Sequence, residues 1–268
     1  MCIRDSSNRG GAVTVYFGAL HFTGPNTTFT GNRAIIGGAL FVVESNVNIT
    51  AETTITNNTA RDFGGGAYFY QTSLLILAST NILSNRAGYS GGGIYILSSS
   101  IIVTSSSEST MHSLAIIDNT AELGGGLFIS SNAHIYVYQL DPRPHNLSTI
   151  LANNDAEYGG AIYVQDETNI AVCEASQSAE SVSADCFFQV VDLFEQRGIL
   201  ELYFESNTAN MLGPIMFGGL LDRCVVTQLT NTSFFDTDLR SSLSQLNCLL
   251  YTSPSPRDAT LSRMPSSA

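Results

Sequence analysis

The sequence contains no lysine, and its basic side chains are all arginine. Lysine and arginine together number 11 against 23 aspartate and glutamate residues, so the formal net charge is −12. A chain this acidic is repelled by the phosphates of nucleic acids and by anionic lipid headgroups. We therefore expect no nucleic-acid partner, no binding to membrane surfaces and no direct membrane insertion within this chain.

Helical periodicity is also missing, because no stretch of adequate length repeats its apolar residues with the period of a helix. The apolar residues instead form short runs of β-branched and aromatic side chains, each bounded by polar turn residues. Hydrophobic residues still make up 44% of the chain, which is ample for a core. The pattern predicts an all-β protein.

The two ends of the chain differ from the sequence between them. Residues 1–6 back-translate to ATGTGTATAAGAGACAG, the mosaic end used by transposase-based DNA library kits. Residues 248–253 back-translate to the mirror of that sequence, and residues 254–268 fit the adapter that follows it. We predict that 1–6 and 248–268 are adapter-derived and that 7–247 is the biological sequence of a fragment. A flexible tail rich in serine and proline is the alternative at the carboxyl-terminal end.

Cysteine is scarce once these ends are set aside, since only Cys173, Cys186 and Cys224 remain. We predict a disulfide between Cys173 and Cys186, which bound a loop of Ser, Ala and acidic residues. Two free thiols, or a bond from either cysteine to Cys224, are the alternatives. Five Asn-x-Ser/Thr sequons also favour a secretory route, and so we expect an extracellular or cell-surface location. These candidate glycosylation sites are Asn26, Asn48, Asn57, Asn146 and Asn231.

One unit repeats along nearly the whole chain at intervals of roughly 30 residues. Each unit has an Asn-x-Ala sequence, a glycine pair or triplet shortly after it, and then short strand-like stretches such as 67–70, 73–77 and 80–83. We predict a right-handed parallel β-helix of the pectin lyase-like class, with about six to seven coils that are truncated at both ends and three strands per coil. It would span 7–247 and carry an insertion at 168–198 between its coils.

The geometry of stacked coils explains the asparagine in each unit. Successive coils lie about 4.8 Å apart, so equivalent residues lie directly above one another. An asparagine at a tight corner can then donate its side-chain amide to the next asparagine, and we predict such a ladder; binding of a ligand is the alternative role. The glycines provide close backbone approach and positive φ values at the next turn. The predicted ladder consists of Asn32, Asn58, Asn85, Asn119, Asn154 and Asn207.

The repeats resemble those of the chlamydial polymorphic outer membrane proteins, which pair Gly-Gly-Ala-(Ile/Leu/Val) with an apolar-x-x-Asn stretch. The second motif occurs here at 82–85, 116–119 and 204–207. In that family the repeats form β-helical adhesin regions, so the resemblance implies an adhesive role. A closer resemblance is to long extracellular proteins of early-branching animals, whose repeats precede a Cys-bounded insertion and a stretch like 218–224. The fold is well specified by these repeats, whereas the function is not.

No constellation of catalytic residues emerges from the sequence. The carboxylates near the repeat motif lie mostly in the turn between asparagine and glycine, where solvated turn residues are common. The four histidines are isolated, and the glycines form neither a phosphate-binding loop nor a calcium nonapeptide. We therefore expect no enzyme activity, no metal and no cofactor. The carboxylates considered are Asp62, Asp118, Glu122, Asp155 and Glu157.

The strand after each glycine turn is apolar on both faces, so one face could remain outside the core. Counting from the glycines predicts that Phe41, Phe69, Ile96, Ile129 and Tyr163 share one face. The same count assigns Leu40, Tyr68, Tyr95, Phe128 and Ile162 to the other. We predict a possible binding stripe at Tyr68, Tyr95 and Phe128, which could contact sugar rings or a protein; burial beneath the insertions is the alternative.

The expected function is a non-catalytic extracellular scaffold or adhesion module that binds a protein or glycan partner at a cell surface. A polysaccharide-active or carbohydrate-binding β-helix is the second hypothesis. A bacterial autotransporter passenger is a third, weaker one.

Overall fold

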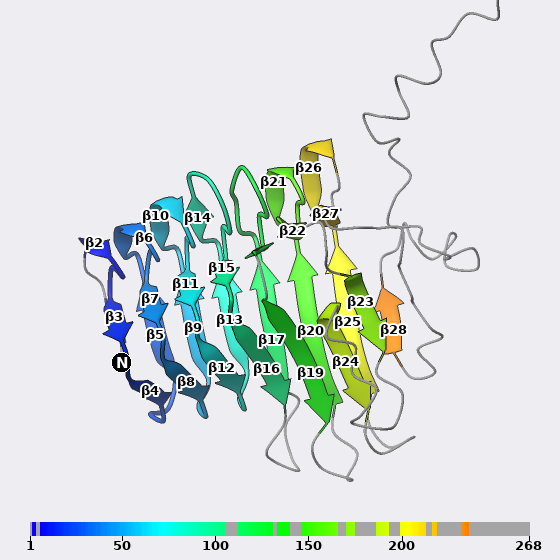
Figure 1. Ribbon diagram of the computed structural model, residues 1–268, viewed down its shortest axis with the longest axis horizontal. Coiled ribbons are helices and arrows are strands. Elements are labelled where there is room, and N and C mark those ends of the chain that lie inside the picture. Colours follow the sequence, from blue (N-terminus) through cyan, green and yellow to red (C-terminus); the bar gives the residue numbers. More distant parts are fainter. Residues whose placement is uncertain are drawn as a thin grey trace, which may run out of the picture.

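The computed structural model describes residues 2–3, 6–104, 112–130, 133–139, 146–165, 170–174, 186–192, 199–212, 216–218 and 232–235. All regular structure in these residues is β-strand, and every strand pairing between them is parallel. Figure 1 shows the strands stacked coil upon coil along one axis. The predicted parallel β-helix is therefore confirmed.

Three sheets run along the solenoid, each built from one strand of every coil in its path. Sheet I contains β1 (Cys2–Ile3), β5 (Thr27–Thr30), β9 (Thr53–Thr56), β13 (Thr80–Leu83), β17 (His112–Ile117), β20 (Asn146–Ala152), β25 (Ile199–Glu205) and β28 (Thr232–Phe235). Sheet II contains β3 (Val13–Tyr16), β7 (Leu40–Val43), β11 (Ala67–Tyr70), β15 (Ile94–Leu97), β18 (Leu127–Ile129), β22 (Ile162–Val164) and β27 (Met216–Gly218). Sheet III contains β4 (Ala19–Phe22), β8 (Asn46–Ile49), β12 (Ser73–Ile76), β16 (Ser100–Thr104), β19 (His134–Gln139), β24 (Cys186–Asp192) and β23 (Ile170–Glu174).

A fourth set of short strands lies at the corner between sheets I and II. It comprises β2 (Ser6–Arg9), β6 (Arg33–Ile36), β10 (Thr59–Phe63) and β14 (Arg86–Ala87), followed by the pair β21 (Asp155–Tyr158) and β26 (Thr208–Leu212). These strands contain the x-Ala residues of the Asn-x-Ala units, which the sequence predicted as a turn. The prediction of three strands per coil was therefore wrong, because the backbone after each asparagine is extended enough to pair with the next coil.

The number of coils also differs slightly from the prediction of six to seven for the whole chain. Residues 6–104, which are described without a gap, form about four coils. The later strands extend the same sheets, with segments between them that lie outside the described residues. The described residues contain no helix long and apolar enough to cross a membrane.

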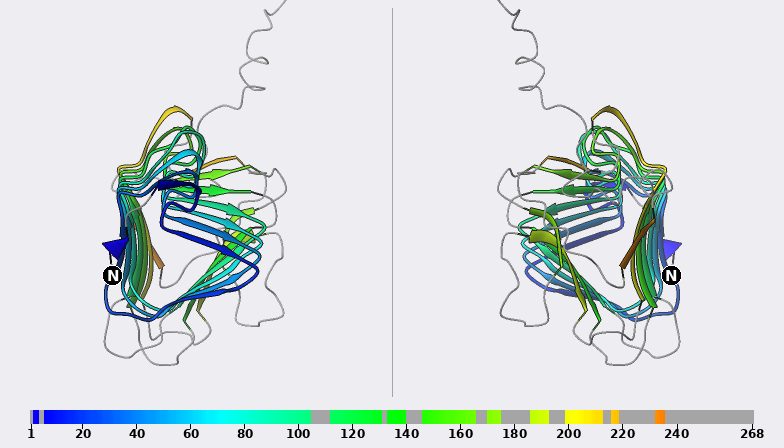
Figure 2. Two further views of the ribbon diagram at one scale, coloured as in Figure 1. Left: turned by 90° about the vertical axis from the view of Figure 1, so that its left-hand side faces the viewer. Right: turned by 90° about the vertical axis from the view of Figure 1, so that its right-hand side faces the viewer.

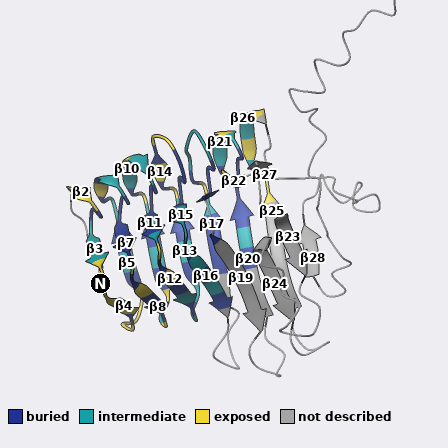
Figure 3. Cartoon of the chain, viewed as in Figure 1, coloured by how far each residue is buried: buried dark blue, intermediate teal, exposed yellow. Residues whose placement is uncertain are grey.

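The end-on views of Figure 2 show the three sheets surrounding a common interior. The buried apolar side chains of all three sheets form one cluster, which is the core. Alternate residues of each strand point inward, so each interior row contains equivalent side chains from successive coils. In sheet II one such row contains Leu40, Ala67, Ile94, Leu127 and Ile162, each at most 1% exposed. Figure 3 shows that the strands of the inner coils are largely buried, whereas β3 and β4 of the first coil are mostly exposed or half-buried.

Three corners of the repeating coil contain a residue with positive φ. The first glycine of each pair or triplet is this residue between the corner strands and sheet II, with φ of 64° at Gly37 and 65° at Gly64. Mostly non-glycine residues occupy the position at the two other corners, as Ser84 does after sheet I (φ 53°) and Gln71 does after sheet II (φ 49°). The chain therefore accepts left-handed backbone at every coil, and only one of these corners is reserved for glycine.

Candidate functional site

The six repeat asparagines lie in one continuous row at the corner between sheet I and the corner strands. Each of the first five donates its Nδ2 to the Oδ1 of the next asparagine, at 2.8, 3.0, 3.1, 3.0 and 3.0 Å in order along the chain. The same Oδ1 atoms also accept a hydrogen bond from the backbone N–H of the preceding asparagine. The row therefore fixes the spacing of the coils at this corner.

The asparagine amides also bind the backbone of sheet I. The Nδ2 of Asn85 donates to the Ile55 carbonyl at 2.9 Å, and the Nδ2 of Asn119 donates to the Ile82 carbonyl at 2.9 Å. Asn32, Asn58, Asn85, Asn119 and Asn154 are at most 1% exposed. Both amide hydrogens and the carbonyl oxygen of these central side chains are thus engaged, which leaves them a structural role rather than a ligand-binding one.

Aromatic side chains form a second row, on the outer face of sheet II. The register aligns Phe41 with Tyr68, Tyr68 with Tyr95, Tyr95 with Phe128 and Phe128 with Tyr163. Adjacent ring centroids in this aromatic row lie 5.2, 5.0, 4.7 and 5.1 Å apart, and their planes differ by at most 13°. The three predicted stripe residues therefore lie together, stacked along the solenoid axis.

The predicted division of the strand residues between two faces was partly wrong. Phe41 and Tyr163 belong to the aromatic row, whereas Leu40 and Ile162 belong to the interior row of sheet II. The error comes from counting residues from the last glycine. Repeats with two glycines have an alanine where the others have a third glycine, which shifts the count by one.

The stacking determines what the aromatic row can present to a partner. Because neighbouring rings cover one another's faces, the row offers ring edges and tyrosine hydroxyls to solvent. Phe41 and Phe128 are only 5% and 4% exposed, and Tyr68, Tyr95 and Tyr163 are half-buried. A flat sugar ring therefore cannot stack on the middle of this row.

Further aromatic side chains widen this surface. Tyr16 lies beside Phe41, with ring centroids 5.6 Å apart, and is 44% exposed. Phe63, from β10, lies 5.3 Å from Tyr95 and 6.3 Å from Tyr89, which is 55% exposed. Together with the aromatic row, Tyr16, Phe63, Tyr70 and Tyr89 make up what we call the aromatic face.

Burial of the tyrosines within the row opposes their ionisation. Burial raises the pKa of Tyr68 to about 12, with smaller contributions in the same direction from Tyr95 and Tyr70. Burial likewise raises the pKa of Tyr95 and of Tyr163. These hydroxyls therefore remain neutral at physiological pH.

Raising the pH should destabilise the protein through Tyr68. An unfolded tyrosine ionises near pH 10, so the folded state holds the proton longer than the unfolded state does. The contribution of Tyr68 to stability should be complete below about pH 10 and should be lost as the pH rises towards about 12. Titration of tyrosinate absorbance should show a late-ionising group that is missing in Tyr68→Phe. A wild-type titration in which all tyrosines ionise near pH 10 would contradict this prediction.

The carboxylates considered from the sequence do not converge. Asp62 pairs with its exposed neighbour Arg61 at 2.9 Å, and the hydrogen bond from Arg61 lowers the pKa of Asp62. Asp118 and Glu157 are exposed, and Glu122 and Asp155 are half-buried. Within the described ranges, no group of three His, Cys, Asp or Glu residues could hold a metal ion.

Three of the five candidate glycosylation sites have described side chains. Asn26, with φ of 50°, and Asn57, with φ of 56°, occupy exposed turns, and Asn48 lies on the outer face of β8, where its Nδ2 is 3.3 Å from His21 Nδ1. Asn146 lies in β20, but its side chain is outside the described residues, as is Asn231 altogether.

The predicted disulfide also stays a prediction. Cys173 lies in β23 and Cys186 in β24, and these strands pair with Cys186 opposite Ile170. Neither cysteine side chain belongs to the described residues, and Cys224 lies outside them.

Sequence reasoning missed a second polar row, at the corner between sheets II and III. Gly18 and Thr72 donate their backbone N–H groups to the Oγ atoms of Ser45 and Ser99, at 3.1 and 2.9 Å. The signal was a serine or threonine two residues after three successive strands of sheet II, β7, β11 and β15, at Ser45, Thr72 and Ser99. An open polar groove of about 660 Å³ lies over this row.

The comparisons with known proteins add no family to this description. Neither a protein-family model, nor a curated protein, nor a solved structure matches the chain.

Proposed function

We propose that this chain is a non-catalytic scaffold module of a secreted or cell-surface protein and that it binds a protein partner through the aromatic face. The observation that carries the proposal is the continuity of that face, whose stacked rings extend over five coils of sheet II and are bordered by the exposed Tyr16 and Tyr89. Apolar surface of this kind, rimmed by polar residues, typically marks interaction sites. Aromatic side chains are also enriched among the residues that dominate the energetics of protein interfaces.

The stacked geometry favours a protein over a glycan as the partner at this face. The row is held in place by its own ring contacts, so little side-chain entropy is lost when a partner docks. Ring edges and neutral hydroxyls suit apolar side chains and backbone carbonyls, whereas sugars prefer open ring faces. The resemblance of the repeats to β-helical adhesin regions of chlamydial and early animal proteins is consistent with this role.

Removing the exposed aromatic side chains should weaken adhesion without unfolding the protein. Tyr16 and Tyr89 lie at the margin of the aromatic face, and Tyr16→Ser with Tyr89→Ser should reduce binding of the chain to animal cells at least tenfold. The melting temperature should change by only about 3 °C or less, because both side chains are largely exposed. Fluorescently labelled protein and flow cytometry would measure the binding.

Met211, which is 63% exposed on the corner strand β26, provides the matched control, and Met211→Ser should leave binding unchanged. Mild protease treatment of the cells should abolish binding if the partner is a protein. Binding that survives both the tyrosine changes and the protease would overturn the proposal. Release of reducing ends or unsaturated products from polysaccharides would instead support the hypothesis of a carbohydrate-active enzyme.

A further inference from the structure

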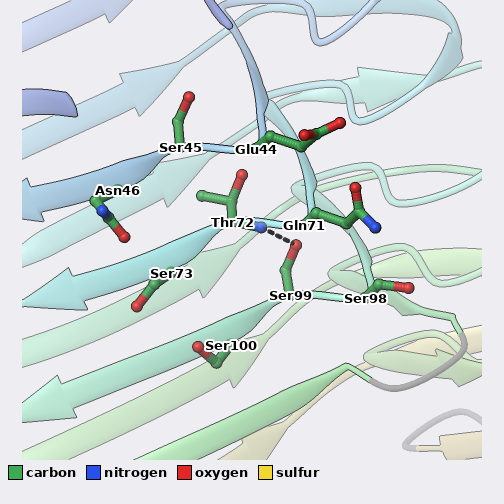
Figure 4. Close-up of a pocket in the computed structure, with 9 residues that line it drawn as sticks. All are labelled: Glu44, Ser45, Asn46, Gln71, Thr72, Ser73, Ser98, Ser99 and Ser100. Atoms are coloured by element: carbon green, nitrogen blue, oxygen red, sulfur yellow. Dashed lines mark hydrogen bonds between the residues drawn. The ribbon is translucent and has the colours of Figure 1, made fainter. Parts of the chain in front are cut away.

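The polar groove at the corner between sheets II and III is an open surface over the row of Ser45, Thr72 and Ser99. Figure 4 shows its side chains coming from three successive coils. The groove measures about 660 Å³ and is open to solvent along its length. Every residue that lines it is polar, and only one of them carries a charge. The lining consists of Glu44, Ser45, Asn46, Gln71, Thr72, Ser73, Ser98, Ser99 and Ser100.

The floor of the groove is rigid. Ser45, Thr72 and Ser99 are at most 5% exposed. Their hydroxyls donate to carbonyls two residues earlier, at 2.7 Å for Ser45, 3.0 Å for Thr72 and 2.8 Å for Ser99. Together with the backbone hydrogen bonds onto the Oγ atoms of Ser45 and Ser99, these contacts fix the positions of the side chains above them.

The walls of the groove, by contrast, keep hydrogen-bonding capacity for a ligand. Among the described residues, the side chains of Glu44, Asn46, Gln71 and Ser73 make no hydrogen bond, and all four are exposed. They provide a carboxylate, two amides and a hydroxyl on a repeat set by the coil spacing of about 4.8 Å. Both donors and acceptors are therefore presented at regular intervals along the solenoid axis.

The backbone at this corner is strained at two of the wall residues. At the corner after sheet I, the residues with positive φ are Gly31, Asn57, Ser84, Asp118, Asn153 and Ser206, which are small or tolerate left-handed backbone. The groove corner has Ser98 with φ of 48° in its third coil, but it also has Glu44 with φ of 47° and Gln71 with φ of 49°. Long side chains have no preference for this conformation, and such strain is typical of functional positions.

An aromatic ring lies at the amino-terminal end of the same row. Phe17, with φ of 53°, occupies the position of Glu44 one coil earlier, and its N–H donates to the Val43 carbonyl at 3.1 Å. The side chain is 73% exposed and makes no ring contact with another described aromatic residue. Unlike the rings of the aromatic row, Phe17 therefore has an open face that can stack on a sugar.

We propose that this groove binds a neutral, hydroxyl-rich glycan chain along the solenoid axis, with Phe17 stacking on one sugar and the wall side chains hydrogen-bonding its hydroxyls. The proposal rests on the binding role proposed above but assigns it a second surface and a second class of ligand. Glu44 and the net charge of −12 disfavour polyuronides. The absence of apolar residues from the lining disfavours hydrophobic small molecules.

Glycine substitutions at the wall residues with positive φ should lower the affinity for the glycan without lowering the stability of the fold. Gln71→Gly and Glu44→Gly remove a wall side chain while placing glycine where it is free of strain, so the melting temperature should stay within about 3 °C of the wild type. Each should weaken binding about tenfold, as expected for the loss of hydrogen bonds to a ligand. Phe17→Gly should have a similar effect. Ser84→Gly, at an exposed residue with φ of 53° on the other corner, is the matched control and should bind normally.

The probes are soluble neutral oligosaccharides of glucan, mannan and chitin type, with oligogalacturonate as the anionic counterpart, and calorimetry and NMR titration measure binding. We expect at least one neutral oligosaccharide to bind and oligogalacturonate to bind more weakly. If no neutral oligosaccharide binds at millimolar concentration, or if the groove variants bind as the wild type does, the glycan proposal fails. In either case the protease-sensitive adhesion that depends on Tyr16 and Tyr89 remains measurable, so the two proposals can fail separately.

Discussion

Replacing Asn85 with leucine is expected to lower the free energy of unfolding by about 4–6 kcal/mol. Asn85 lies in the middle of the asparagine row and is 1% exposed. Its Nδ2 donates to the Ile55 carbonyl and to Asn119 Oδ1, and its Oδ1 accepts from the backbone N–H and the Nδ2 of Asn58. Leucine has a similar volume but can replace none of these four hydrogen bonds.

The cost is large because the partners stay buried. Asn58 and Asn119 are both fully buried, so water cannot satisfy the groups that leucine leaves without a partner. Each buried donor or acceptor that loses its partner costs about 1–3 kcal/mol. The loss also interrupts the row between the coils on either side, so we expect the two halves of the solenoid to unfold less cooperatively.

Asn46→Leu is the matched control for this experiment, because it makes the same chemical change at an exposed outer position of β8. Surface substitutions of this kind usually change stability by less than about 0.5 kcal/mol. Urea denaturation followed by circular dichroism would measure both variants. Equal stability of the two variants would show that the asparagine row does not hold the coils together.

Much of the solenoid could be predicted because the strand-like stretches of the sequence are the same segments that pair between successive coils. The stretches 67–70 and 80–83 match β11 and β13, and 73–77 contains β12. The asparagine row could be inferred as well, since equivalent residues of a parallel coil must lie above one another. Repeat spacing alone therefore identified both the strands and the row of buried amides.

The corner strands and the polar groove could not be predicted from the repeat pattern. The short corner strands follow directly after the asparagines, and the residue that each buries next is a small alanine, as Ala34 and Ala60 are, so they show little of the apolar alternation that marks a strand. The polar groove arises from residues that are ordinary turn formers when taken singly. Only the pairing of three coils shows that Glu44, Gln71 and Ser98 form one row above Ser45, Thr72 and Ser99.

The glycines of the repeat also differ in a way that the sequence does not reveal. Each two-glycine repeat has an alanine in place of the third glycine, as the hydrogen bond from Ala39 N–H to the Gly66 carbonyl at 2.9 Å shows. The third position therefore accepts a Cβ, whereas the second does not. From the sequence alone the three positions look equivalent.

Replacing Gly65 with alanine is expected to destabilise the protein by at least about 4 kcal/mol. A Cβ at Gly65 would lie 2.2 Å from the Gly92 carbonyl oxygen and 2.5 Å from the Arg86 carbonyl carbon. Both atoms belong to the backbone of the next coil, so no side-chain rotation can relieve the contact. The coils would have to separate, and that would stretch the hydrogen bond from Gly65 N–H to the Gly91 carbonyl, now 2.9 Å long.

Two further alanine variants turn this prediction into a graded test. Gly66→Ala should cost clearly less than Gly65→Ala, because Ala39 occupies the same position in the preceding coil and its Cβ is accommodated there. Gly24→Ala should be neutral or stabilising by up to about 1 kcal/mol, because no atom lies within 4 Å of the added Cβ and alanine restricts the unfolded chain. Thermal unfolding should therefore rank the three variants in that order. If Gly65→Ala melted as high as Gly24→Ala, the close approach of successive coils at the second glycine could not be what holds them in register.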